Sequence, residues 1–124
     1  MRYSIDKADN FTVFTLDEEN LNSIIAPDLK SEFIILRNEG VKNLIFDLKD
    51  VKYVDSSGLS AILTANRLWK GYGNFVITDV NHEPVKRLIE ISRLDSILTI
   101  VDEFNDAVKY IEDHVEESTA GEDN

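Results

Sequence analysis

The stretch from residue 51 to residue 60 decides the fold, and it reads Val51-Lys52-Tyr53-Val54-Asp55-Ser56-Ser57-Gly58-Leu59-Ser60. It follows residues 41–48, whose nearly continuous apolar order is typical of a strand buried on both faces. It precedes residues 57–70, in which apolar and polar side chains recur with helical rhythm. The stretch is therefore predicted to be the turn from a central strand into an amphipathic helix.

The two serines and the glycine in this stretch fit the start of a helix. The hydroxyl of Ser57 or Ser56 can cap the helix by accepting a hydrogen bond from a free N–H, and Gly58 lets the backbone approach its neighbours closely. Asp55 has two interpretations. We favour the one in which its carboxylate binds backbone N–H groups of the turn, over one in which it orients the neighbouring hydroxyl for phosphoryl transfer.

The rest of the chain alternates between strand and helix patterns. Strands are predicted at residues 3–7, 11–16, 41–48, 75–80 and 97–101, and helices at residues 27–38, 57–70, 84–92 and 103–115. The buried helix faces are expected to include Ile35 and Ile91. This order predicts one α/β domain: a mostly parallel sheet of four to five strands with an antiparallel N-terminal hairpin, and about four helices packed mainly on one face.

Composition and charge favour a protein partner. The chain has 13 Lys and Arg against 24 Asp and Glu, a net charge of −11, which opposes a phosphate-neutralising surface for nucleic acid or anionic lipid. It has no cysteine, which excludes disulfides and thiolate metal sites, and no other ligands cluster. No segment approaches the roughly 18 apolar residues that span a bilayer, and no signal peptide is visible. We expect a cytoplasmic protein without a cofactor.

The length of 124 residues fits a single domain. We place this domain at residues 1–116 and expect residues 117–124 to form an acidic, flexible tail, because they have almost nothing to bury. A tail that binds a partner is the less favoured alternative.

Asp55-Ser56-Ser57-Gly58-Leu59, at the end of the third strand, resembles the signature of the STAS family, the domain of anti-sigma-factor antagonists and of sulfate-transporter tails. Ala26-Pro27-Asp28-Leu29 is similar to the opening of the family's first helix, and Leu44-Ile45-Phe46-Asp47-Leu48 to its central strand. Residues 71–77 and 85–95 resemble the next turn and strand and the third helix. The resemblance spans about residues 3–115.

The resemblance implies a protein-binding switch rather than an enzyme. In the antagonists, the first serine of the motif accepts a phosphoryl group from an ATP-dependent anti-sigma kinase, and Ser56 stands at that position, with Ser57 as the helix cap. The unphosphorylated chain would sequester the anti-sigma serine kinase and so free a sigma factor, and a serine phosphatase would restore that form. The expected partner-binding residues are Asp55, Ser56, Ser57, Gly58, Leu59, Ser60, Thr64 and Arg67.

A phosphoryl group would act through charge. It adds about −1.5 to −2 charge beside Asp55 in a chain that is already acidic, so partner docking should weaken. The positive end of the helix dipole tolerates the added charge, so the fold should survive. We expect a monomer or weak dimer with no direct nucleic-acid contact and no membrane insertion.

The chain departs from the family pattern after the second strand. Many antagonists carry a Gly-Glu-Leu-Asp-like segment there, with an acidic residue that helps form the partner surface. This chain has Leu16-Asp17-Glu18-Glu19-Asn20-Leu21-Asn22, which is acidic but lacks the glycine. We interpret Asp17, Glu18 and Glu19 as a solvated loop.

Two other classes of function are alternatives to this switch. A serine enzyme needs a positioned base, but the two histidines, His82 and His114, lie at a predicted helix start and near the end of the last predicted helix, and the Gly-x-Ser-x-Gly elbow is absent. The alternative is a non-phosphorylated STAS interaction subunit of a transporter or signalling assembly, which would share the fold. Trp69 and Tyr53 are interpreted as core aromatics rather than a ligand pocket.

Overall fold

The computed structural model describes the backbone of residues 1–122 and the side chains of residues 1–115. Along the chain its elements are β1 (Tyr3–Lys7), β2 (Thr12–Leu16), β3 (Asn20–Leu21), α1 (Ala26–Asn38), β4 (Asn43–Asp47), β5 (Tyr53–Val54), α2 (Ser56–Trp69), β6 (Asn74–Thr78), α3 (Glu83–Ile91), a 3-10 turn (Leu94–Ser96), β7 (Thr99–Ile100) and α4 (Phe104–Glu122). None of the helices in this described part is long and apolar enough to cross a membrane.

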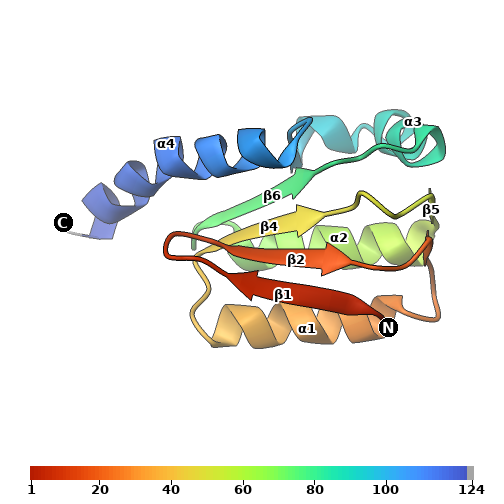
Figure 1. Cartoon of the computed structure of the whole chain (residues 1–124), viewed down its shortest axis with the longest axis horizontal. Coiled ribbons are helices and arrows are strands. Elements are labelled where there is room, and N and C mark those ends of the chain that lie inside the picture. Colours follow the sequence, from red (N-terminus) through yellow and green to blue (C-terminus); the bar gives the residue numbers. More distant parts are fainter. Residues whose placement is uncertain (123–124) are drawn as a thin grey trace.

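The main sheet has five strands in the order β1-β2-β4-β6-β7 (Figure 1). β1 and β2 pair antiparallel, with Ile5 opposite Phe14, and the other three pairs are parallel. Each parallel pair is connected through a helix, as parallel strands require. The carboxyl ends of β4 and β6 therefore lie at the same edge of the sheet. The predicted fold class is confirmed.

The larger core lies between the sheet and the helices α1 and α2. The ring of Phe33 on α1 stands edge-on to Phe46 and Phe75, with centroid distances of 5.2 Å and 5.8 Å, a favourable arrangement for aromatic pairs. The Nε1–H of Trp69 donates to the carbonyl of Val41 at 2.9 Å, so this buried indole is satisfied. The interpretation of Trp69 as a core residue is confirmed.

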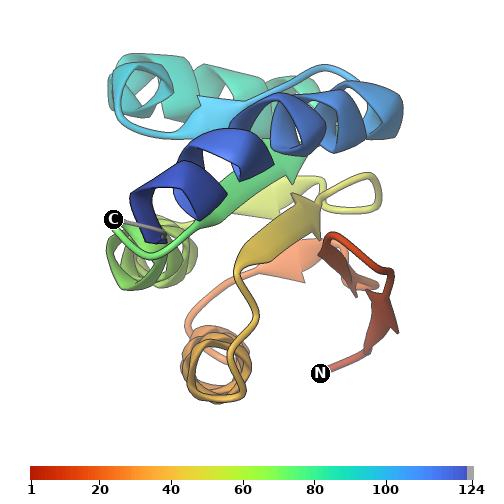
Figure 2. The ribbon, with the colours of Figure 1, turned by 90° about the vertical axis from the view of Figure 1, so that its left-hand side faces the viewer.

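α4 covers the opposite face of the sheet, where Ile45 and Val76 meet Ala107 and Ile111 (Figure 2). Neighbouring residues of a strand point to opposite faces, so Phe46 belongs to the larger core and Ile45 to the smaller one. This double covering explains the unbroken apolar order of β4. Since α3 also contributes to the larger core, three of the four described helices pack there, as expected.

Some local expectations are wrong. Ile35 is 49% exposed and Ile91 is 72% exposed, because at about 100° per residue each lies well off the buried stripe of its helix. Tyr53, predicted to be a core aromatic, is 58% exposed. α4 continues to Glu122, past its predicted end at Val115. The acidic tail predicted for residues 117–124 falls where side chains lie outside the described residues, so it stays a prediction.

A small second sheet, which the sequence did not indicate, leads into α2. β3 and β5 pair in parallel, with Leu21 opposite Val54. The backbone N–H groups of Lys52 and Tyr53 both donate to the carbonyl of Glu19, at 2.8 Å and 3.1 Å. Strands of two residues are too short to show a period in the sequence. The pair fixes the segment immediately before the motif.

Candidate functional site

The turn into α2 is closed by Asp55, which is the N-cap of the helix. Its Oδ1 accepts a hydrogen bond from the N–H of Gly58 at 2.9 Å, and its Oδ2 accepts one from the N–H of Ser23 at 3.3 Å. The expectation that Ser57 or Ser56 caps the helix is wrong, because the carboxylate one residue earlier already satisfies the first-turn donor. The favoured interpretation of Asp55, as an acceptor for backbone N–H groups, is confirmed.

Gly58 lies where α2 packs closest to the small sheet. It is buried, and a β-carbon at this position would lie 2.4 Å from the carbonyl oxygen of Leu21 and 2.8 Å from a side-chain carbon of Val54. Only glycine fits this approach without a shift of the backbone. Gly58 thus sets the position of α2 and lies beneath the surface that a partner would meet.

Capping by Asp55 leaves both serines free of that role. Ser56 is exposed and Ser57 is half-buried, and neither hydroxyl has a hydrogen-bond partner among the described residues. Both lie in the first turn of α2, where free N–H groups and the positive end of the dipole favour an anion. A group added to Ser56 would therefore lie outside the core and near free backbone N–H groups, and would leave the core unchanged.

A shallow hollow lies between the starts of α1 and α2, which run side by side and begin at the same end of the sheet (Figure 1). Its volume is about 260 Å³, and it is lined by Ser23, Ala26, Pro27, Lys30, Ser56, Ser57 and Ser60. Among these described lining residues, only Lys30 carries a charge. The hollow is therefore lined mainly by polar side chains and by one cationic residue, and the Asp55 carboxylate lies beside it through Ser23.

The other predicted contact residues follow the same helix. Arg67 is exposed, and its Nη2 donates to the Oγ1 of Thr64 at 3.4 Å, while that hydroxyl donates to the carbonyl of Ser60 at 2.9 Å. Ser56, Ser60, Thr64 and Arg67 fall within about a quarter of the helix circumference. Leu59 points away from this stripe and packs against the larger core. Partner contact by these residues stays a prediction.

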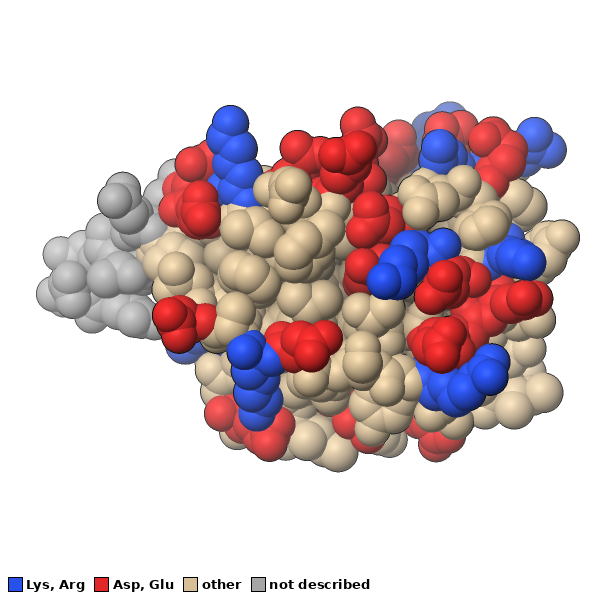
Figure 3. Space-filling model, in the orientation of Figure 1, with Lys and Arg blue, Asp and Glu red and all other residues tan. Residues whose placement is uncertain are grey.

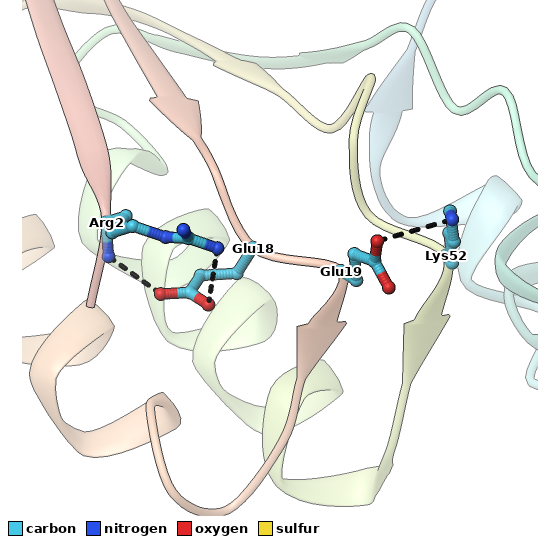
Figure 4. A network of polar contacts seen from close by, with 4 residues as sticks. All are labelled: Arg2, Glu18, Glu19 and Lys52. Atoms are coloured by element: carbon cyan, nitrogen blue, oxygen red, sulfur yellow. Dashed lines mark hydrogen bonds and ion pairs between the residues drawn. The ribbon is translucent and has the colours of Figure 1, made fainter.

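The acidic loop before β3 is tied to neighbouring segments (Figure 4). The backbone N–H of Arg2 donates to Glu18 at 2.8 Å, and its guanidinium lies 4.0 Å from the other carboxylate oxygen. Glu19 lies 3.3 Å from the Nζ of Lys52. Asp17 and Glu19 are exposed, as expected of a solvated loop, whereas Glu18 is half-buried and holds the N-terminal segment.

Three residues beside the motif were missed by the sequence analysis. Ser23 joins the site through Asp55, and Lys30 joins it through the hollow. Ile24, the next residue after Ser23, is 80% exposed. The contact between the starts of α1 and α2 depends on tertiary packing and leaves no local pattern. The only available signal was Ile24 in the segment Leu21-Asn22-Ser23-Ile24-Ile25-Ala26, and it is weak because exposed apolar residues are common.

A second polar cluster lies at the carboxyl ends of β4 and β6. Asp47 is buried, accepts a hydrogen bond from the N–H of Lys49 at 2.9 Å and pairs in register with Thr78. Asp79 adopts a left-handed backbone with φ of 58°. Burial and the neighbouring Asp47 carboxylate raise the pKa of Asp79. The described residues contain no group of three or more side chains suited to hold a metal ion.

The chain is similar to known proteins over most of its length. The model of the STAS domain matches residues 2–107. The anti-sigma F factor antagonist of Paenibacillus polymyxa is 37% identical over 73 residues, which are 57% of this chain and 61% of that protein. The match thus spans less than two thirds of that relative's length.

Solved structures show the same fold. The Thermotoga maritima protein TM1081, a proposed anti-sigma factor antagonist, superimposes with a TM-score of 0.78 at 26% identity, over 89% of this chain and 94% of that one. The Bacillus cell fate determinant SpoIIAA in its phosphorylated form gives a TM-score of 0.68 at 15% identity, over 89% and 99%, a likeness of fold alone. From the match over residues 2–107 and the shared fold it follows that this chain belongs to the STAS domain family.

Proposed function

We propose that this chain is an anti-sigma factor antagonist whose binding state is set by phosphorylation of Ser56. In the unphosphorylated form it sequesters an anti-sigma serine kinase and so frees a sigma factor, and a serine phosphatase regenerates this unphosphorylated form. The relative named an anti-sigma F factor antagonist and the phosphorylated form known for SpoIIAA support this proposal. Because such a kinase draws on cellular ATP, we place the chain in the cytoplasm.

The observation that carries the proposal is the exposed hydroxyl of Ser56 in the first turn of a helix that a different residue caps. A kinase can reach this oxygen without opening the fold. The product carries about −1.5 to −2 additional charge next to Asp55, on a surface where an anionic or apolar partner group would otherwise dock. Recognition changes while the capping hydrogen bond between Asp55 and Gly58 remains.

The surroundings of Ser56 offer a mixed docking surface. The stripe formed by Ser60, Thr64 and Arg67 provides polar contacts along α2, and the exposed side chains of Ile24 and Tyr53 provide apolar contacts from the segments before α1 and α2. Protein interfaces commonly combine apolar and aromatic anchors with a polar rim. We therefore place the partner across the starts of both helices.

Phosphorylation is tested by incubating the chain with ATP and a candidate anti-sigma serine kinase, followed by mass spectrometry of its peptides. The wild type and Ser57→Ala should carry one phosphate on Ser56, and Ser56→Ala should carry none. Ser57→Ala is a matched control, because it removes the neighbouring hydroxyl and leaves the cap intact. A phosphate on Ser57, or anywhere but Ser56, would show that the assignment is wrong.

Binding is tested with the same kinase and two substitutions of similar size. Ser56→Asp adds a charge and should weaken binding about tenfold or more, which corresponds to about 1.4 kcal/mol, whereas Ser56→Asn should weaken it much less. Calorimetry or biolayer interferometry measures both. If Ser56→Asp binds as tightly as the wild type, a non-phosphorylated interaction subunit of a larger assembly becomes the better description.

A further inference from the structure

We propose that Lys30 of α1 binds the phosphoryl group of Ser56 and holds it in the hollow between α1 and α2, an inference that rests on Ser56 being the modified residue. Lys30 and Ser56 come from different helices and line the same hollow of about 260 Å³. The phosphorylated side chain then fills a preformed recess instead of extending into solvent.

The ammonium group of Lys30 has no competing partner in the described part of the chain. On a helix, ion pairs form between residues three or four positions apart. For Lys30 these positions hold Ala26, Pro27, Phe33 and Ile34, none of which is acidic. The nearby Glu32 is two positions away, so the helix turns its side chain to a different side from Lys30. Lys30 is thus available for an anion at Ser56.

The rest of the hollow supplies hydrogen-bond donors. Ser23, Ser57 and Ser60 are among its lining residues, and the N–H groups of Ser56 and Ser57 have no acceptor among the described residues. A phosphoserine presents three acceptor oxygens, and hydrogen bonds to charged groups are about twice as strong as neutral ones. Asp55 opposes the new charge, but both of its oxygens already accept hydrogen bonds.

Binding by Lys30 has a regulatory consequence. In the unphosphorylated chain, Lys30 adds a positive charge to the surface beside Ser56, where a partner carboxylate could pair with it. In the phosphorylated chain, the same ammonium group is occupied by the phosphate. Phosphorylation then both adds negative charge and removes an available positive one, so it changes the docking surface more than the phosphate alone would.

The test uses the full chain with phosphoserine placed at position 56 by genetic encoding, so no kinase is needed. Phosphorus NMR follows the titration of the phosphate in the parent, Lys30→Met, Lys30→Arg and Lys109→Met. Methionine keeps the apolar stem of lysine, and Lys109, exposed on α4 across the sheet, is the control for the loss of one charge. Melting curves of the unphosphorylated variants check the fold, with Lys30→Gln as a second neutral variant.

The phosphate of the parent should lose its second proton about half a pH unit or more below the ordinary value near 6, because a nearby cation favours its dianion. Lys30→Met and Lys30→Gln should raise the pKa of the phosphate again by about half a unit, whereas Lys30→Arg and Lys109→Met should leave it lowered as in the parent. Equal values in Lys30→Met and Lys109→Met would overturn the inference. Since no kinase takes part, this outcome is independent of whether a kinase labels Ser56.

Discussion

Asp55 ties two segments of backbone together, because each of its carboxylate oxygens has its own N–H donor. Replacing Asp55 by Ala removes both bonds and should lower the free energy of unfolding by about 1–2 kcal/mol, the usual cost of a lost N-cap. Asp55→Asn keeps an oxygen for the N–H of Gly58 and should stay within about 0.5 kcal/mol of the wild type. Urea titrations measure both variants. Equal losses in the two would mean that the charge, and not the hydrogen bond, holds the turn.

Asp79 should make stability depend on pH. Because its pKa is raised by burial and by Asp47, the folded chain binds a proton that the unfolded chain has already released. This group therefore stabilises the fold at low pH, and its contribution is lost as the pH rises from the ordinary value of 3.8 through the raised pKa of the folded state.

The corresponding substitution is Asp79→Asn, which removes the charge and suits the left-handed backbone at this position. Its melting temperature should exceed that of the wild type at pH 7, by up to a few degrees, and should approach the wild-type value near pH 4. Calorimetry at the two pH values measures the difference. A gap of the same size at both would show that the charge of Asp79 does not carry the effect.

At the scale of elements, the contact between α2 and the small sheet depends on the absence of a side chain at Gly58. Gly58→Ala should cost about 1–3 kcal/mol, because the added carbon would meet the carbonyl of Leu21 and force a backbone shift. This cost outweighs the gain of up to about 1 kcal/mol that alanine gives in an open helix. Ser60→Ala, two residues on, is the control and should change stability little. A stabilised Gly58→Ala would rule out the close approach of the two backbones.

The elements also show what the sequence can predict. The helices and the strands β1, β2, β4 and β6 were predicted because each is long enough to display its period, whereas the two-residue β7 was predicted only as part of the longer stretch 97–101. β3 and β5 were not, since two residues display none. The cap was assigned to a serine because Ser and Asp are equally good caps, and only the structure shows which side chain faces the N–H of Gly58.

At the scale of the whole molecule, the chain carries a net charge of −11. On the face shown in Figure 3, acidic and basic side chains are interspersed around a largely uncharged centre. The sequence predicted the acidic character and the motif, including the position of Ser56. It did not predict the hollow or the role of Lys30, because these depend on how α1 and α2 pack together, which no single segment encodes.

We propose that residues 1–116 form the STAS domain and that residues 117–124 add little to its stability. A chain that ends at residue 116 should keep the free energy of unfolding within about 0.5 kcal/mol, because residues 117–124 contain one apolar side chain, Ala120, and so offer little to bury. Urea unfolding of the two chains measures this. A loss of more than about 1 kcal/mol would show that the tail supports the fold.

Asp55 caps α2 one residue before the proposed phosphate acceptor, so the stability of the helix and the proposed signal depend on different side chains. A fold that depended on the hydroxyl of Ser56 could not change that residue without weakening itself. Here the adjacent carboxylate of Asp55 caps the helix, so Ser56 can be replaced by threonine, asparagine or glutamate while the fold stays unchanged. Under the proposed function, such substitutions would hold the chain in its binding form, hold it in its non-binding form, or make it a substrate of a different kinase.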